Sequence, residues 1–162
     1  MEKIAKSVYI ADGAKVVGNV TIGEDSSVWY NAVIRADSAM IEIGKNTNVQ
    51  DNVVLHASHG HDISIGDNVT IGHGAIIHGC TLKNNVLVGM GAIVLDGAVI
   101  EENCMVGAGA LVTQNKVIPA GALVLGNPAK VVRTVTEEEK ESILKNAIEY
   151  AKEAKFYQEK GL

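Results

Sequence analysis

Large aromatic side chains, cysteine and proline are all scarce in this chain. Aromatic residues make up 4% of it, and there are only 2 cysteines and 2 prolines. The two cysteines, Cys80 and Cys104, do not make a disulfide framework, so we expect both to be buried thiols. With 47% hydrophobic residues, 20% charged residues and 17 glycines, the chain is neither disordered nor collagen-like. Its core must be built from Val, Ile, Leu and Ala, which suits a narrow and regular interior.

Charge and hydropathy exclude two kinds of partner. The formal net charge is −5, and no block of Lys or Arg gathers enough positive charge to hold a nucleic acid backbone. The longest nearly apolar run, 86–95, contains two glycines and is shorter than the ~20 residues that a membrane-spanning helix needs. The N-terminus has no apolar segment of signal-peptide length. We therefore expect a soluble cytoplasmic protein with no membrane segment and, at 162 residues, a single core.

The dominant pattern is a repeat of six residues. Aliphatic residues recur with this period in four in-phase series: Ile10, Val16, Ile22, Val28 and Ile34; Ile43, Val49 and Leu55; Ile65, Ile71 and Ile77; and Leu82, Val88, Val94, Ile100, Val106, Val112, Ile118 and Val124. Helices repeat at 3.6 and strands at 2, so neither gives this spacing. A six-residue unit is a short strand plus a corner, and three units close a triangular coil of about 18 residues.

This repeat predicts an all-β fold, a left-handed parallel β-helix of roughly six to seven coils. Glycine directly after the inward aliphatic residue, as at Gly23 and Gly44, is expected to permit unusual backbone dihedrals at the corners. A sandwich of short alternating strands would not explain so many repeats in phase.

The period stops after Gly126-Asn127-Pro128, and the end of the chain is predicted to be helical. Thr136 and Glu139 form a capping-box pattern. One apolar face, running to about Tyr157, is formed by Ile143, Ala147, Ile148, Ala151 and Ala154. We expect residues 1–133 to form the β-helix and residues 134–162 a C-terminal helix packed along one of its faces. The exposed faces of a β-helix favour burial by oligomerisation.

All five histidines lie between positions 56 and 78. His56 and His78 both take the second place of their hexapeptides, and their separation equals one coil plus about four residues inserted around 59–64. They should stack on one face, with backbones ~4.8 Å apart. His59 and His61 belong to the insertion and are expected to be solvated.

His73 takes the third place of its hexapeptide, on the preceding face, and cannot easily turn round the corner to join the other two. A neighbouring subunit can supply it. A threefold trimer would then contain three sites of three histidines each. Three neutral imidazoles leave one coordination position open, as in catalytic zinc sites. The alternative is that these histidines are surface or interface residues without a metal.

Polar residues surround this predicted site. Arg35 follows Ile34 as His56 follows Leu55, so it should stack one coil below His56. Gln50 and Asp51 follow Val49 on the other face, with Asp51 in the same place as His73. A bidentate pair of Arg35 with Asp51 across the subunit boundary is our preferred arrangement. The alternative is ordinary solvated polarity of the coil surface.

The stretches VIRADSAMIEIGKNTNVQDNVVLH, IGHGAIIHGC and GNPAKVVR resemble the γ-class carbonic anhydrases and their hexapeptide-repeat relatives. The last stretch and the repeat are shared with hexapeptide acyltransferases and specify only the fold. The resemblance implies a homotrimer that hydrates carbon dioxide to bicarbonate with a metal-bound hydroxide. It implies zinc held by His56 and His78 of one subunit and His73 of the next; three imidazoles also accept iron or cobalt.

Further roles come from the same resemblance. Gln50 would orient the hydroxide with Asn48 close to it, while Arg35 and Asp51 would be the inter-subunit pair. Asp37 would support the interface, and Tyr150 on the terminal helix matches a family active-site tyrosine.

Two positions depart from the best-characterised family type. Ser38 replaces a glutamate, and Ala57-Ser58-His59-Gly60-His61-Asp62 replaces an acidic loop with a proton-shuttling glutamate. Proton removal would then fall to His59, His61 or Asp62, and a histidine is best matched to neutral pH. Two other functions stay open at this point, a CoA-thioester hydrolase or acyltransferase and a non-catalytic trimeric scaffold.

Overall fold

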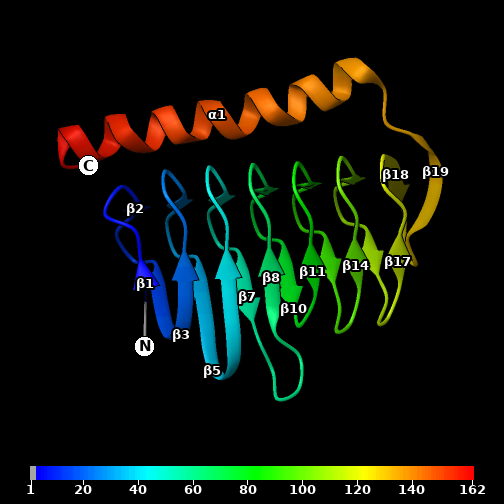
Figure 1. The fold of residues 1–162 in the computed structure, drawn as a ribbon, viewed down its shortest axis with the longest axis horizontal. Helices are drawn as coiled ribbons and strands as arrows, with labels where there is room; N and C mark the ends of the chain where they lie inside the picture. The colour runs from blue at the N-terminus through cyan, green and yellow to red at the C-terminus, as the bar shows by residue number, and fades with distance from the viewer. Residues whose placement is uncertain (1–2) are drawn as a thin grey trace.

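The computed structural model describes residues 3–162, which form a prism of stacked coils with one long helix beside it (Figure 1). The left-handed parallel β-helix predicted from the repeat is confirmed, with about seven turns. Three faces make up the prism, and we name them by what they carry. The histidine face carries His56 and His78, the helix face lies under α1, and the third face is the remaining one.

The strands of each face pair in parallel with the coils above and below. The histidine face contains β7 (Val54–His56), β10 (Ile76–His78), β13 (Ile93–Val94) and β16 (Leu111–Val112). The third face contains β1 (Lys3–Ile4), β8 (Ile63–Ile65), β11 (Thr81–Leu82), β14 (Val99–Ile100) and β17 (Val117–Ile118). Two longer strands, β3 (Lys15–Ile22) and β5 (Val33–Ile43), run round the corner from the histidine face into the third face.

The helix face contains β2 (Tyr9–Ile10), β4 (Ser27–Val28), β6 (Asn48–Val49), β9 (Thr70–Ile71), β12 (Leu87–Val88), β15 (Met105–Val106) and β18 (Ala122–Leu125). Strand β19 (Lys130–Thr134) then pairs antiparallel with β18, and α1 (Glu137–Lys160) follows. The helix contacts β2, β4, β6 and β9. Figure 1 shows it running back along the coils from β19 to the N-terminal end of the prism.

The core is the column of inward aliphatic residues that the repeat predicted. Ile34, Leu55 and Ile77 are in register on the histidine face, and all three are completely buried. Burial of one such side chain contributes about 1.5–3 kcal/mol. Cys80 and Cys104 are buried free thiols, as expected, and burial raises the pKa of Cys80 to about 12. Neither thiol is therefore a thiolate at neutral pH.

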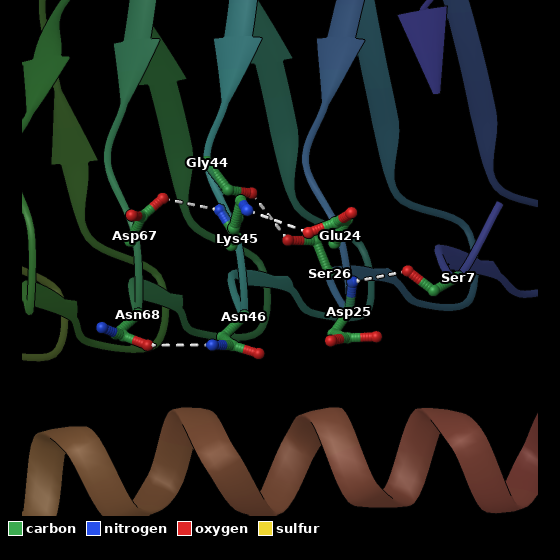
Figure 2. Close-up of polar contacts among 9 residues, drawn as sticks. All are labelled: Ser7, Glu24, Asp25, Ser26, Gly44, Lys45, Asn46, Asp67 and Asn68. Carbon is green, nitrogen blue, oxygen red and sulfur yellow. Dashed lines mark hydrogen bonds and ion pairs between the residues drawn. The ribbon is translucent and has the colours of Figure 1, made fainter. Parts of the chain in front are cut away.

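The corner between the third face and the helix face owes its shape mainly to asparagine. Asn46, Asn68, Asn85 and Asn103 all adopt positive φ between the third face and the helix face, a conformation that asparagine tolerates better than most residues. Their side chains form a ladder in which Asn46 donates to Asn68 at 3.3 Å and Asn68 donates to Asn85 at 3.1 Å. Figure 2 shows the start of this ladder with α1 beside it. The same corner is closed by Asp67, whose Oδ1 accepts from the backbone N–H of Lys45 at 2.7 Å.

Our explanation of the glycines after the inward residues was wrong. Gly23 and Gly44 do not adopt positive φ. They are needed because successive coils approach closely there. A Cβ atom on Gly44 would lie 2.6 Å from the backbone of Gly66 in the next coil.

The C-terminal helix begins and packs largely as predicted. Thr136 and Glu139 form the capping box, and the helix ends one turn later than expected, at Lys160, before Gly161 with φ 68°. Ile143, Ala147 and Ala154 are buried against the prism. Ile148 was expected on this buried face but is 40% exposed. Two tyrosines take the contact with the prism instead, since Tyr150 and Tyr157 pack against Trp29 with ring centroids 5.6 and 5.2 Å apart.

Within residues 3–162, no helix is both long and apolar enough to cross a membrane. The cytoplasmic location stays a prediction from the sequence.

Candidate metal centre

His56 and His78 meet on the histidine face, as their places in the repeat predicted. They are register partners on β7 and β10. The Nδ1 atom of His56 lies 2.9 Å from Nε2 of His78. Two nitrogens bound to one tetrahedral metal at ~2.0–2.1 Å are about 3.3 Å apart. The pair therefore needs to open by only a few tenths of an ångström to fit a zinc-type ion, and both side chains are half-buried.

Arg35 and Asp37 sit beside His56. Arg35 is the register partner of His56 one coil below. Its guanidinium forms a hydrogen-bonded ion pair with Asp37 of the same chain. This contact holds the pKa of the Asp37 carboxyl below its usual range. Asp37 Oδ1 lies 3.5 Å from Nε2 of His56, so a carboxylate anion borders the histidine pair.

Asp96 is a member of the site that we did not predict from the sequence. Its Oδ1 lies 2.5 Å from Nδ1 of His78, and both side chains are half-buried. The repeat contains the signal that could have found it. Val94 is in register with Ile77, so Asp96 lies one coil above Gly79, next to His78.

His73 lies at the end of the helix face. Val49 and Ile71 are register partners, which stacks Asp51 below His73 as predicted. The two side chains form a contact of 2.8 Å between Oδ2 and Nδ1. Among residues 3–162 of one chain, no three His, Cys, Asp or Glu side chains converge to hold a metal. One chain thus brings two of the three predicted ligands together. Both the supply of His73 by a neighbour and the pairing of Arg35 with Asp51 stay predictions.

Gln50 and Asn48 belong to a directed chain of hydrogen bonds that starts at His73. The backbone N–H of His73 can only donate, and it does so to Oε1 of Gln50 at 3.1 Å. Gln50 Nε2 then donates to Oδ1 of Asn48 at 3.1 Å, and Asn48 Nδ2 donates to Oγ1 of Thr70 at 2.9 Å. Asn146 on α1 also donates to Thr70 Oγ1, at 3.2 Å. The obligate donor on His73 fixes the orientation of both amides, and one N–H of Gln50 is left to donate elsewhere.

A pocket of about 200 Å³ opens beside these amides. It is lined by Gln50, Thr70, Gly72, His73, Leu87, Val88, Gly89, Met90 and Asn146. The lining contains polar side chains, such as those of Gln50 and Asn146, and the apolar side chains of Leu87 and Met90. Sequence reasoning did not find Thr70 or Asn146, because the register of the helix on the prism leaves no trace in the hexapeptide pattern.

Tyr150 lies one helical turn beyond Asn146. Its ring meets Trp29 edge to face at a centroid distance of 5.6 Å. Burial, with smaller effects from Glu153 and Asp51, raises its pKa. Tyr150 is thus a neutral phenol at physiological pH, on the side of the helix that faces the prism. A role for it in the reaction stays a prediction.

The inserted loop projects from the prism between β7 and β8. His59 and His61 are exposed, as expected, and Asp62 Oδ1 accepts from the backbone N–H of Met40 at 2.8 Å. A groove of about 630 Å³ between this loop and the bulged part of β5 is lined by Gly18, Asn19, Ala36, Asp37, Ser38, Ala39, Met40 and Asp62. The exposed imidazoles therefore have direct access to solvent.

The histidine face also presents an apolar surface. The outward side chains in register along it form what we call the apolar row: Val33, Val54, Ile76, Ile93 and Leu111. Val54 and Ile76 are 36% and 39% exposed. The corresponding row on the third face is polar at Thr21, Glu42, Ser64 and Thr81 and aliphatic only at its end, at Val99 and Val117. The row on the helix face lies under α1.

Fold and site together define a hexapeptide-repeat β-helix with a histidine pair on one face. Comparisons with known proteins agree with this fold. The family model described as bacterial transferase hexapeptide (six repeats) matches residues 3–36 and 79–114. A Methanocaldococcus jannaschii protein named "Probable carbonic anhydrase" is 60% identical over 92% of this chain and 94% of its own. The Arabidopsis thaliana protein named "Gamma carbonic anhydrase 2, mitochondrial" is 45% identical over 91% of this chain.

The match spans 55% of the Arabidopsis protein. A solved structure of a hexapeptide transferase family protein from Anaplasma phagocytophilum superposes with a TM-score of 0.93 at 45% identity, covering 96% of this chain and 92% of that one. The chain belongs to the γ-class carbonic anhydrase-like family of hexapeptide-repeat proteins.

Proposed function

We propose that this chain is a carbonic anhydrase-like lyase that hydrates carbon dioxide to bicarbonate with a metal ion held by His56, His78 and a third histidine. The observation that carries this proposal is the pair of facing imidazole nitrogens, 2.9 Å apart between adjacent coils. The relatives named as carbonic anhydrases support it. The imidazole set favours zinc, and iron and cobalt are compatible with it.

The third ligand in this proposal is His73 of a neighbouring subunit in a trimer. His73 is at the edge of the prism with its side chain 47% exposed, and the apolar row lies uncovered on the face that carries His56 and His78. A neighbour whose His73 edge packs on the apolar row would complete the site and bury the aliphatic side chains. Three such contacts close a ring without an unpaired surface, and Arg35 would then meet Asp51 across each boundary.

When bound, a zinc-type ion acts as a Lewis acid and lowers the pKa of a coordinated water, as is familiar from carbonic anhydrases generally. The chain's own residues then have separate tasks. Gln50 has one free amide N–H, held in direction by Asn48, with which it can orient the reacting oxygen. The apolar side chains of Leu87 and Met90 in the lining of the adjacent pocket suit an apolar substrate such as carbon dioxide.

Addition of water to carbon dioxide forms one C–O bond and releases one proton, which must leave the site. We assign its removal to the exposed inserted loop, which carries His59 and His61, because imidazole is the side chain best suited to accept a proton in water. The glutamates of the best-characterised family type are absent at Ser38 and in this loop. Replacing His59 and His61 together with alanine should therefore lower turnover and leave metal content unchanged, in low-buffer medium where protein groups must carry the proton.

Metal analysis and carbon dioxide hydration of the same anaerobically purified protein test the proposal. We expect one metal per chain and hydration activity, both lost in His78→Ala, with the metal kept in His59→Ala, a matched change of a solvated histidine. A protein with stoichiometric metal and no hydration activity would overturn the assigned reaction. A wild-type protein without metal affinity would overturn the site itself.

The likeness to a solved hexapeptide transferase family protein favours a second candidate, an acyltransferase or CoA-thioester hydrolase. One variant, His78→Ala, distinguishes the two candidate functions. Turnover of acyl-CoA that survives in His78→Ala, after loss of the metal, would support the second. A trimer that turns over neither substrate and copurifies with a partner would point to a scaffold.

A further inference from the structure

We propose that Asp96 is a positioning residue that holds His78 in the tautomer protonated on Nδ1 and thereby turns its Nε2 toward the metal position. The use of this tautomer for metal binding depends on the proposed function. The tautomer itself does not, and it can be measured in the metal-free protein.

The tautomer follows from hydrogen-bond chemistry. Asp96 Oδ1 lies 2.5 Å from Nδ1 of His78, and an ionised carboxylate only accepts hydrogen bonds. Nδ1 of His78 must therefore carry the proton, which leaves Nε2 of the neutral ring as an acceptor. Nε2 is the atom that faces His56 at 2.9 Å. Metal-binding histidines generally donate their other ring N–H to a carboxylate or carbonyl, and this partner fixes the ring.

Gly79 makes room for the Asp96 carboxylate. A Cβ atom at position 79 would lie 2.3 Å from Asp96 Oδ1 and 2.6 Å from Cβ of His61. Gly79 also has φ +53°, which lets the chain turn immediately after His78. Because Gly79, next to the predicted ligand His78, has no side chain, the carboxylate of Asp96 in the coil above can reach the imidazole.

Two other aspartates, Asp67 at a corner and Asp62 in the inserted loop, differ from Asp96 in what they bind. Each accepts a backbone N–H, Asp67 from Lys45 and Asp62 from Met40. For Asp96 the hydrogen-bond partner within the described residues is the imidazole of His78. Its carboxylate therefore acts on the site and not on the corner of the prism.

The experiment uses the full chain with Asp96→Ala, Asp96→Asn and, as a matched corner variant, Asp67→Asn. Nitrogen-15 NMR of the histidine rings in metal-free protein reports the tautomer at a pH where the imidazoles are neutral, with His78→Ala to assign the signal. We expect the Nδ1–H form of His78 in the wild type and in Asp67→Asn. We expect Nε2–H, or a mixture, in Asp96→Ala.

Metal affinity is then measured by competition of Zn²⁺ and Co²⁺ with a chromophoric chelator, together with the visible spectrum of bound Co²⁺. Loss of such a partner costs tenfold to a hundredfold in affinity, so we expect a loss of about this size in Asp96→Ala, with an altered spectrum. Asp96→Asn keeps an acceptor oxygen and should recover part of the affinity. Asp67→Asn should bind as the wild type does.

An Asp96→Ala protein that keeps the Nδ1–H tautomer would overturn the inference. So would wild-type metal affinity and an unchanged Co²⁺ spectrum in that variant. If the wild type binds no metal but the tautomer still changes in Asp96→Ala, the proposed function fails and the positioning contact stands. The two failures are therefore distinguishable.

Discussion

Replacing Ile76 with aspartate puts a carboxylate in the middle of the apolar row, where the proposed neighbour packs. Ile76 is 39% exposed in the single chain, which corresponds to roughly 70 Å² and to about 1.7 kcal/mol per interface at ~25 cal/mol per Å². Three interfaces lose about 5 kcal/mol together, which lowers the association constant by three to four orders of magnitude. Burying the new charge adds to the loss.

Sedimentation velocity over a range of concentrations, with metal analysis of each species, measures this effect. We expect Ile76→Asp to dissociate at concentrations where the wild type stays trimeric, and to lose metal as it dissociates, because His73 comes from the neighbour. Val117→Asp is the control, since Val117 is 59% exposed on the third face. An Ile76→Asp protein that associates as tightly as the wild type would refute the assignment of the apolar row to the interface, as would dissociation of Val117→Asp alone.

Two further predictions concern the amide chain and the helix cap. Thr70→Val removes the oxygen that Asn48 and Asn146 share. Of the two hydrogen bonds lost, the one from Asn48 belongs to the chain that leads to Gln50; its loss, about 1.4 kcal/mol, should lower hydration turnover about tenfold at unchanged metal content. Thr81→Val is the control, and unchanged turnover would contradict the network. Arg133 lowers the pKa of Glu139 from 4.5 to about 2. The contribution of Glu139 to stability is therefore full above pH 4.5 and lost as pH falls toward 2. The thermal unfolding temperature of Glu139→Gln should depend less on pH in this window than that of the wild type. An equal pH dependence in the two proteins would contradict this role of Glu139.

The sequence allows accurate prediction wherever the hexapeptide pattern alone decides the geometry. The in-phase residues Ile34, Leu55 and Ile77 determine the register of the coils. Once Leu55 and Ile77 are in register, the residues that follow them in their strands, His56 and His78, are in register as well. The stacking of Arg35 below His56 and of Asp51 below His73 could be deduced in the same way.

Contacts outside the ladder could not be predicted. Thr70 meets Asn146 only because α1 lies on the prism in one particular register, and no periodicity encodes that. Ile148 fits an apolar helical face, yet Tyr150 and Tyr157 occupy the contact with the prism because Trp29 offers them a larger aromatic surface. Asp96 is a different case. The ladder places it one coil above Gly79, and it was missed because our prediction extended only to the coil below each histidine.

The central claim is that each metal site takes His56 and His78 from one subunit and His73 from the next. Co-expression of His73→Ala and His78→Ala chains tests it directly, since neither variant can form a complete site alone. In randomly mixed trimers about one quarter of the interfaces combine an intact His56/His78 face with an intact His73 edge. We predict that metal binding and hydration activity return to about this fraction of the wild-type level. Mixed trimers with no more metal than either variant alone would contradict the shared site.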